Sequence, residues 1–206
     1  MLLLLIGVVL WSFVHLYPAL LPESRKHLFD KLGEGPYKGL FTVGIFAGIA
    51  LIVIGWRSIT PTGIYAPLLG PGPVTGVLVL LTFILFAASG IPGNIRRFIR
   101  HPQMTGTILW GVSHLLSNGS NRAIVLFGGL TLWAVLEIVL INKRDGAWQK
   151  PEPAPIKKDV ITVVGGIVVY LVVIYFHKGL FGVAALIRVQ PLTGTTPFVR
   201  SEERRV

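Results

Sequence analysis

Long apolar runs alternate with short polar connectors along almost the whole chain. Five runs are long enough to cross a bilayer, which takes about 20 residues. A shorter run precedes the last two, and together the six cover residues 2–21, 40–56, 74–91, 105–116, 123–141 and 160–176. Proline and charge gather in the connectors, as is typical of loops. The pattern predicts an all-α fold, an integral membrane bundle of about six transmembrane helices.

The runs form one continuous series, so we interpret residues 1–190 as a single transmembrane helical domain. The first run has no Lys or Arg before Arg25 and contains Trp11. It therefore predicts an uncleaved span rather than a signal peptide. Residues 24–32 predict a short interfacial helix. Residues 191–206 are rich in Pro, Thr and Arg and predict a flexible C-terminal tail.

Composition narrows the class of protein further. The chain of 206 residues is 52% hydrophobic and 14% charged, whereas average soluble domains carry about 25% charge. Its net charge is +10, but the basic residues lie in loops between spans, so we expect lipid surroundings and no nucleic acid. There is no cysteine, which excludes a disulfide framework, a thiolate ligand and a cysteine nucleophile.

The distribution of basic residues predicts the orientation. The connectors after the first, third and fifth spans hold twelve Lys and Arg residues, whereas those after the second and fourth hold two. By the positive-inside rule, the odd-numbered connectors are cytoplasmic and both termini face the other side. We expect a multi-pass protein of the inner (cytoplasmic) membrane.

Two histidines lie inside the apolar runs, where an ionisable residue is costly and is a candidate for function. His15 belongs to the first run and His114 to the shorter fourth run. We expect both imidazoles between the cytoplasmic interface and the midplane. At matching depth on facing helices they could ligate a haem iron. The alternative is that each is only hydrogen-bonded inside the bundle.

A basic turn precedes the fourth run. It consists of Arg96, Arg97 and Arg100, and His101-Pro102 then opens the helix. A helix N-terminus presents free amides and the positive end of the dipole. The cluster is thus a candidate anion site for haem propionates, a lipid phosphate or a nucleotide cofactor. The alternative is that these are ordinary positive-inside arginines, although that does not explain His101.

Three further polar residues have open interpretations. Asn118 lies one turn beyond His114 and either orients a ligand or caps the helix. Glu137 either pairs with an arginine of the basic turn or reaches the interface. His177 ends the last run, and we expect an interfacial role.

The segment RHPQMTGTILWGVSHLLSNG, residues 100–119, resembles the signature of the NnrU family of membrane proteins. The resemblance extends over roughly residues 1–187. It includes the histidine of the first span, Leu32-Gly33-Glu34 in the next connector, and the closing His177-x-x-x-Phe181-Gly182.

The resemblance implies a link to denitrification, because the family accompanies nitrite and nitric oxide reductases. Its plant relative is 15-cis-zeta-carotene isomerase, a membrane haem b enzyme. The relative implies His15 and His114 as haem ligands, and a cysteine three residues before the second histidine. Here that position is Gly111, so a thiolate ligand switch cannot be carried over.

A second resemblance leaves the function open. An Arg-His-Pro helix opening, followed about 35 residues later by a helix with a glutamate, is similar to isoprenylcysteine methyltransferase-like membrane proteins. That resemblance implies S-adenosylmethionine near Arg100, His101 and Glu137. A non-catalytic assembly or regulatory factor is a third possibility. The expectations are therefore a haem b protein with a lipophilic small-molecule substrate, a methyltransferase-like enzyme, or a protein without catalysis.

Overall fold

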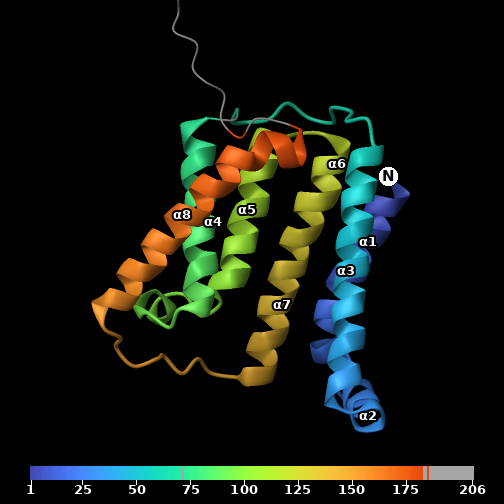
Figure 1. Ribbon diagram of the computed structural model, residues 1–206, viewed down its shortest axis with the longest axis vertical. Coiled ribbons are helices and arrows are strands. Elements are labelled where there is room, and N and C mark those ends of the chain that lie inside the picture. The colour runs from blue at the N-terminus through green and yellow to red at the C-terminus, as the bar shows by residue number, and fades with distance from the viewer. Residues whose placement is uncertain (71, 183–184, 186–206) are drawn as a thin grey trace, which may run out of the picture.

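The computed structural model describes residues 1–70, 72–182 and 185, and in these the chain is built of helices (Figure 1). The long helices are α1 (Leu2–Leu20), α3 (Glu34–Ser58), α4 (Pro73–Gly90), α5 (Pro102–Ser117), α7 (Gly129–Asp145) and α8 (Ile156–Phe181). Shorter elements join them: α2 (Pro22–Leu32), the 3-10 turn η1 (Asn94–Arg97), α6 (Asn121–Ala123) and the π-helical turn η2 (Ile124–Gly128). The all-α prediction is confirmed. The predicted flexible tail lies outside the described residues.

Five helical runs in the described chain are long and apolar enough to cross a membrane. They are Leu2–Leu20, Glu34–Ser58, Pro73–Gly90, Asn121–Asp145 and Ile156–Gly179. The sixth predicted helix, α5, has 16 residues and so spans about 24 Å, less than the roughly 30 Å hydrocarbon core. It lies inside the bundle, packed between α4 and α7. The chain is a multi-pass membrane protein.

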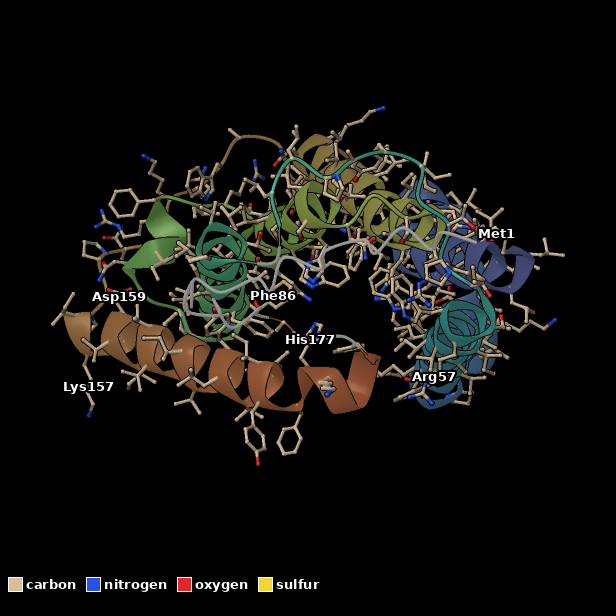
Figure 2. All side chains as sticks on the ribbon, turned by 90° about the horizontal axis from the view of Figure 1, so that it is seen from above. Met1, Arg57, Phe86, Lys157, Asp159 and His177 are labelled. Atoms are coloured by element: carbon tan, nitrogen blue, oxygen red, sulfur yellow. The ribbon has the colours of Figure 1, made fainter. Side chains whose placement is uncertain are left out.

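The long helices pack in an order that differs from their order in sequence. Neighbours in space follow the row α3, α1, α7, α5, α4, α8. Seen from above, this row bends, with α3 at one end and α8 at the other (Figure 2). Helix α1 therefore contacts both α3 and α7, and α5 contacts both α7 and α4. Helix α1 carries His15 and α5 carries His114, on either side of α7.

Small residues bring α1 and α3 together. A Cβ added to Gly48 would lie 2.8 Å from Trp11 Cβ, and one added to Gly44 would lie 3.0 Å from Val14 Cγ2. On the α1 side, a Cβ added to Gly7 would lie 2.6 Å from the backbone nitrogen of Ile52. The close helix approach that glycines four apart permit is therefore present.

The connectors between helices lie at two opposite ends of the bundle. Helix α2, η1 and residues 146–155 lie at one end, whereas residues 59–70 and 118–120 lie at the other (Figure 1). The interfacial helix predicted over 24–32 is present as α2. The three predicted basic connectors thus share one end, as six long helices that alternate in direction require.

Asp159 fixes the start of α8 to η1. Its Oδ1 accepts from the backbone nitrogens of Asn94, at 2.7 Å, and Ile95, at 3.2 Å, and its Oδ2 accepts from Asn94 Nδ2 at 2.6 Å. Asn94 also bonds Ala154 in both directions. This network joins the turn before α5 to the connector before α8.

Candidate functional site

His15 lies on α1, half-buried among aromatic rings. Its ring centroid is 4.0 Å from that of Trp11, 5.4 Å from that of Trp133 on α7 and 5.8 Å from that of Phe41 on α3. Its Nδ1 is 2.8 Å from the carbonyl oxygen of Trp11. A carbonyl only accepts, so Nδ1 carries the hydrogen and Nε2 of the neutral ring keeps its lone pair.

His114 on α5 repeats this arrangement. Its Nδ1 is 2.8 Å from the carbonyl oxygen of Trp110, one turn earlier. Its ring stacks on Phe127, with centroids 4.4 Å apart and planes 21° apart. In the described chain neither Nε2 has a hydrogen-bond partner. Metal-ligating histidines usually donate their other ring nitrogen to such a partner, which fixes tautomer and orientation.

The π-helical turn η2 places Phe127 against His114. Residues Ile124–Gly128 form one wide turn between α6 and α7, and such π turns are frequent at functional sites. Phe127 contacts His114, Trp110 and also Trp56 at the end of α3. The sequence contained only a weak signal for this turn, the pair Gly128-Gly129.

Gly111 permits the approach of α5 to α7. A Cβ at this position would collide with Thr131 Oγ1 and lie 2.8 Å from the carbonyl oxygen of Phe127. Thr131 Oγ1 donates to that same carbonyl at 2.7 Å. There is thus no room for the cysteine that the isomerase resemblance implies at this position.

The two imidazoles lie at different depths. His15 is five residues, about 7.5 Å, from the end of α1 that joins α2, whereas His114 is three residues, about 4.5 Å, from the opposite end of the bundle. Their partners Trp133 and Phe127 are six residues, about 9 Å, apart along η2 and α7. The expectation that the two rings lie at matching depth is therefore wrong, because His114 lies in the half of the bundle away from the basic connectors. Haem ligation by either ring stays a prediction.

His177 is a residue whose proximity to the site the sequence did not indicate. It lies on α8, on the side facing the rest of the bundle (Figure 2). It is close enough to His114 for the two rings to interact electrostatically, and its ring centroid is 4.8 Å from that of Phe181. The bending of the helix row brings α8 toward α5, and a sequence pattern cannot show that.

Four buried polar atoms in the described chain have no hydrogen-bond partner: Ser12 Oγ, Arg122 Nε, Trp133 Nε1 and Glu137 Oε2. Leaving such a group unsatisfied costs about 1–3 kcal/mol. Trp133 belongs to the aromatic cluster around His15, and Glu137 follows one turn later on the same face of α7. The charge of Glu137 interacts with Arg144 of its own helix, which is not one of the basic-turn arginines that formed one of its two alternative interpretations.

The basic turn holds the connector after α7. Arg100 Nη1 donates to the carbonyl oxygen of Gly146 at 2.9 Å, and Arg97 Nε donates to that of Pro151 at 3.1 Å. His101 Nε2 and Asn142 Oδ1 are 2.8 Å apart. Arg96 makes no such bond within the described residues. Anion or S-adenosylmethionine binding here stays a prediction, but Arg97 and Arg100 already have a structural role.

Asn118 acts as part of the turn that ends α5. Its Oδ1 accepts from the backbone nitrogen of Ser120 at 3.1 Å, and the neighbouring Gly119 carbonyl accepts from Ile64 at 2.8 Å. Arg122 closes the same end of the bundle. Its Nη1 donates to the carbonyl oxygen of Trp56 at 3.1 Å while its guanidinium carbon lies 4.3 Å from the Trp56 ring centroid.

The fold and the site together define an all-α membrane bundle in which two histidines, on α1 and α5, are each oriented by a hydrogen bond to the carbonyl four residues earlier. The family model described as NnrU protein matches residues 3–185, and the chain belongs to the NnrU family. No curated protein and no solved structure matches the chain.

Proposed function

We propose that this NnrU-family protein binds haem b inside the membrane, with His15 and His114 as iron ligands. The main support for the proposal is a hydrogen bond that both rings make. Each donates Nδ1–H to the carbonyl four residues earlier, and this leaves Nε2 to a ligand. An imidazole oriented in this way is a ligand that haem iron takes, and because the two rings lie at different depths, each would hold its own haem.

The surroundings of both rings fit an apolar, planar group. Trp133 and Phe41 flank His15, and Phe127 stacks on His114. Haem iron needs only one or two protein ligands, because the porphyrin supplies the other four. Among the described residues no three His, Asp or Glu side chains gather as ligands, so a cofactor that brings its own ligands suits this bundle.

Bound haem would supply a redox-active iron. The protein's own contribution would be to hold it in the apolar interior and to fix the ligand rings through helix carbonyls. A substrate that reaches this depth must itself be lipophilic. We therefore favour a redox or isomerase-type reaction on a lipophilic molecule, associated with nitric oxide metabolism as in the family, over a reaction on a water-soluble metabolite.

Single histidine variants test the ligand assignment. Because the rings lie at different depths, we expect His15→Ala and His114→Ala each to remove part of the bound haem and leave the remainder ligated by the other histidine. Haem content per protein and the Soret band of the purified variants are the readouts. His27→Ala is the matched control, since His27 lies exposed on α2 outside the spans.

Two other outcomes would change or refute the ligand assignment. If each of the two variants loses all its haem, one haem is clamped by both rings, and α1 and α5 must shift to bring them to one depth. If neither variant changes the haem content or the spectrum relative to His27→Ala, the histidines are not ligands and the assignment fails.

A further inference from the structure

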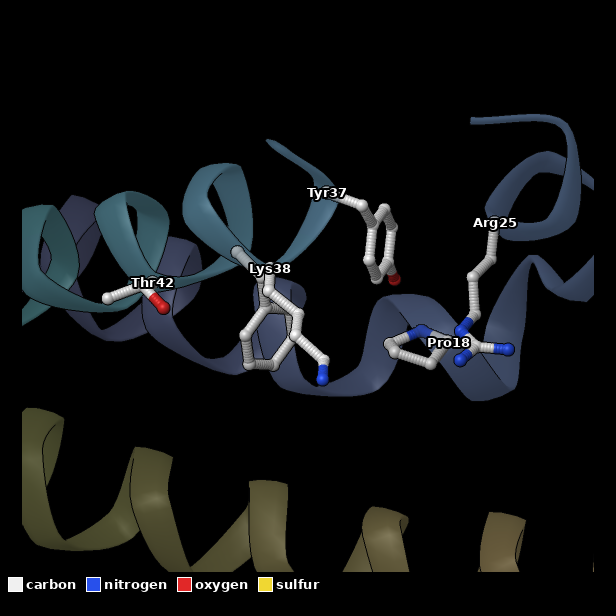
Figure 3. Close-up of a pocket in the computed structure, with 6 residues that line it drawn as sticks. Pro18, Arg25, Tyr37, Lys38 and Thr42 are labelled. Carbon is white, nitrogen blue, oxygen red and sulfur yellow. The ribbon is translucent and has the colours of Figure 1, made fainter. Parts of the chain in front are cut away.

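A cavity of about 360 Å³ lies where α1, α2 and α3 meet, at the end of the bundle that holds the basic connectors. Two cationic side chains, two rings and two smaller groups line it: Pro18, Arg25, Tyr37, Lys38, Phe41 and Thr42. The Arg25 guanidinium and the Tyr37 hydroxyl point toward Pro18, and Lys38 reaches toward the same place from α3 (Figure 3).

The two cations of the cavity differ in how they are compensated. Lys38 Nζ pairs with Glu34 Oε1 at 2.6 Å on the exposed surface of α3. Arg25 lies over the face of the Tyr37 ring, with its guanidinium carbon 5.8 Å from the ring centroid. It has no carboxylate or carbonyl partner in the described residues. The cavity therefore presents one uncompensated guanidinium, whose planar fork suits a phosphate.

An apolar strip leads from the cavity along α3 into the span. Phe41, Ile45 and Ile49 follow Lys38 on one helix face, at spacings of three and four residues. Phe41 and Ile45 are half-buried, and Ile49 is 41% exposed although it lies well inside the helix. A cationic mouth followed by a partly exposed apolar strip matches an amphiphile with an anionic head, and a fully water-soluble anion would not use the strip.

We propose that this cavity binds the phosphate headgroup of an anionic lipid from the cytoplasmic leaflet, with Arg25 as its main contact and an acyl chain along Phe41, Ile45 and Ile49. The location favours a lipid, because the cavity opens at the predicted cytoplasmic interface, where anionic lipids attract basic residues. The proposal does not rest on haem binding, although Phe41 also contacts the His15 ring.

Lipid retention by the purified full-length protein tests the proposal. The detergent-solubilised protein is titrated with phosphatidylglycerol, and bound lipid is counted by native mass spectrometry. We expect Arg25→Gln to weaken binding by at least about tenfold, the loss of a charge-assisted contact. Lys26→Gln is the matched control, because it removes the neighbouring charge of α2 that does not line the cavity, and it should bind like the wild type.

Thr42→Trp fills the cavity without removing charge, and it should also abolish retention while the protein elutes as one species. Equal retention by Arg25→Gln and Lys26→Gln, or normal retention by Thr42→Trp, would overturn the site. Inorganic phosphate is the competing probe. If it displaces the lipid at comparable concentration, the cavity is a site for free phosphate and the assignment to a lipid fails.

Discussion

At the scale of single residues, each intramembrane histidine is held by its own helix. Nδ1 of His15 and of His114 bonds the carbonyl four residues earlier, so the orientation of both rings depends on local helix geometry and not on a distant partner. Aromatic neighbours from α7 and η2 then pack against the ring faces. This preorganisation is what a ligand histidine needs.

Gly111 gives a direct test of how tightly α5 must approach α7. A methyl group there meets Thr131 Oγ1 and the Phe127 carbonyl, so Gly111→Ala should destabilise the protein by about 1–3 kcal/mol, as overpacking does. Gly128→Ala is the control, since a Cβ at Gly128 meets nothing within 4 Å. Thermal unfolding in detergent is the measurement, and equal midpoints for the two variants would contradict this packing.

The residue types were predictable, but their partners were not. His15, His114 and His177 are visible as ionisable groups in or beside apolar runs. The contacts of His15 with Trp133 and of His114 with Phe127 join helices far apart in sequence, and no spacing rule relates such positions. The same holds for Arg25, which sequence alone places in a polar connector and the structure places at a cavity.

At the scale of elements, the turn before α5 serves to anchor a loop. Arg97 and Arg100 donate to backbone carbonyls of residues 146–155. These acceptors are neutral, so the hydrogen bonds hold the loop without cancelling the charge of the arginines. The sequence predicted an anion-binding site from a helix start with nearby arginines. The structure adds that Arg97 and Arg100 connect the start of α5 to the end of α7.

Variants of Arg100 and Arg96 can distinguish loop anchoring from anion binding. If Arg100 mainly anchors the connector, Arg100→Ala should lower stability by about 1 kcal/mol, the net value of one hydrogen bond, and should make residues 146–155 easier to cleave by protease. Arg96→Ala should do neither. If both variants retain less haem than the wild type, without a change in stability or cleavage, the result would instead support the anion site that the sequence predicts.

The helices themselves were largely predictable, because apolar length sets their number and proline and glycine set their ends. The π turn η2 was not. A wide turn inside a continuous apolar run leaves the hydrophobic pattern almost unchanged, and only its contacts with His114 and Trp56 reveal it.

At the scale of the whole molecule, the six helices form one bent row with basic connectors at one end. The order of the row could not be predicted, because membrane helices are apolar on all sides and their sequences do not single out the face that meets a neighbour. Glycine contacts such as that of Gly48 with Trp11 select the α1–α3 pair, and these depend on both helices at once.

The absence of cysteine makes the orientation easy to measure. We expect Lys150→Cys, in the connector before α8, to react with a membrane-impermeant maleimide only after the membrane is opened. Ile64→Cys, in the exposed loop at the other end, should react in intact cells stripped of their outer envelope. Reaction of Lys150→Cys from the outside, with Ile64→Cys protected, would contradict the orientation.

The absorption spectrum of the wild-type protein, purified in detergent after expression with ample haem supply, is the most direct test of haem binding. We expect a Soret band with the signature of imidazole-ligated haem b and a haem content proportional to the amount of protein. A protein that is folded and monodisperse but free of haem under these conditions would contradict it.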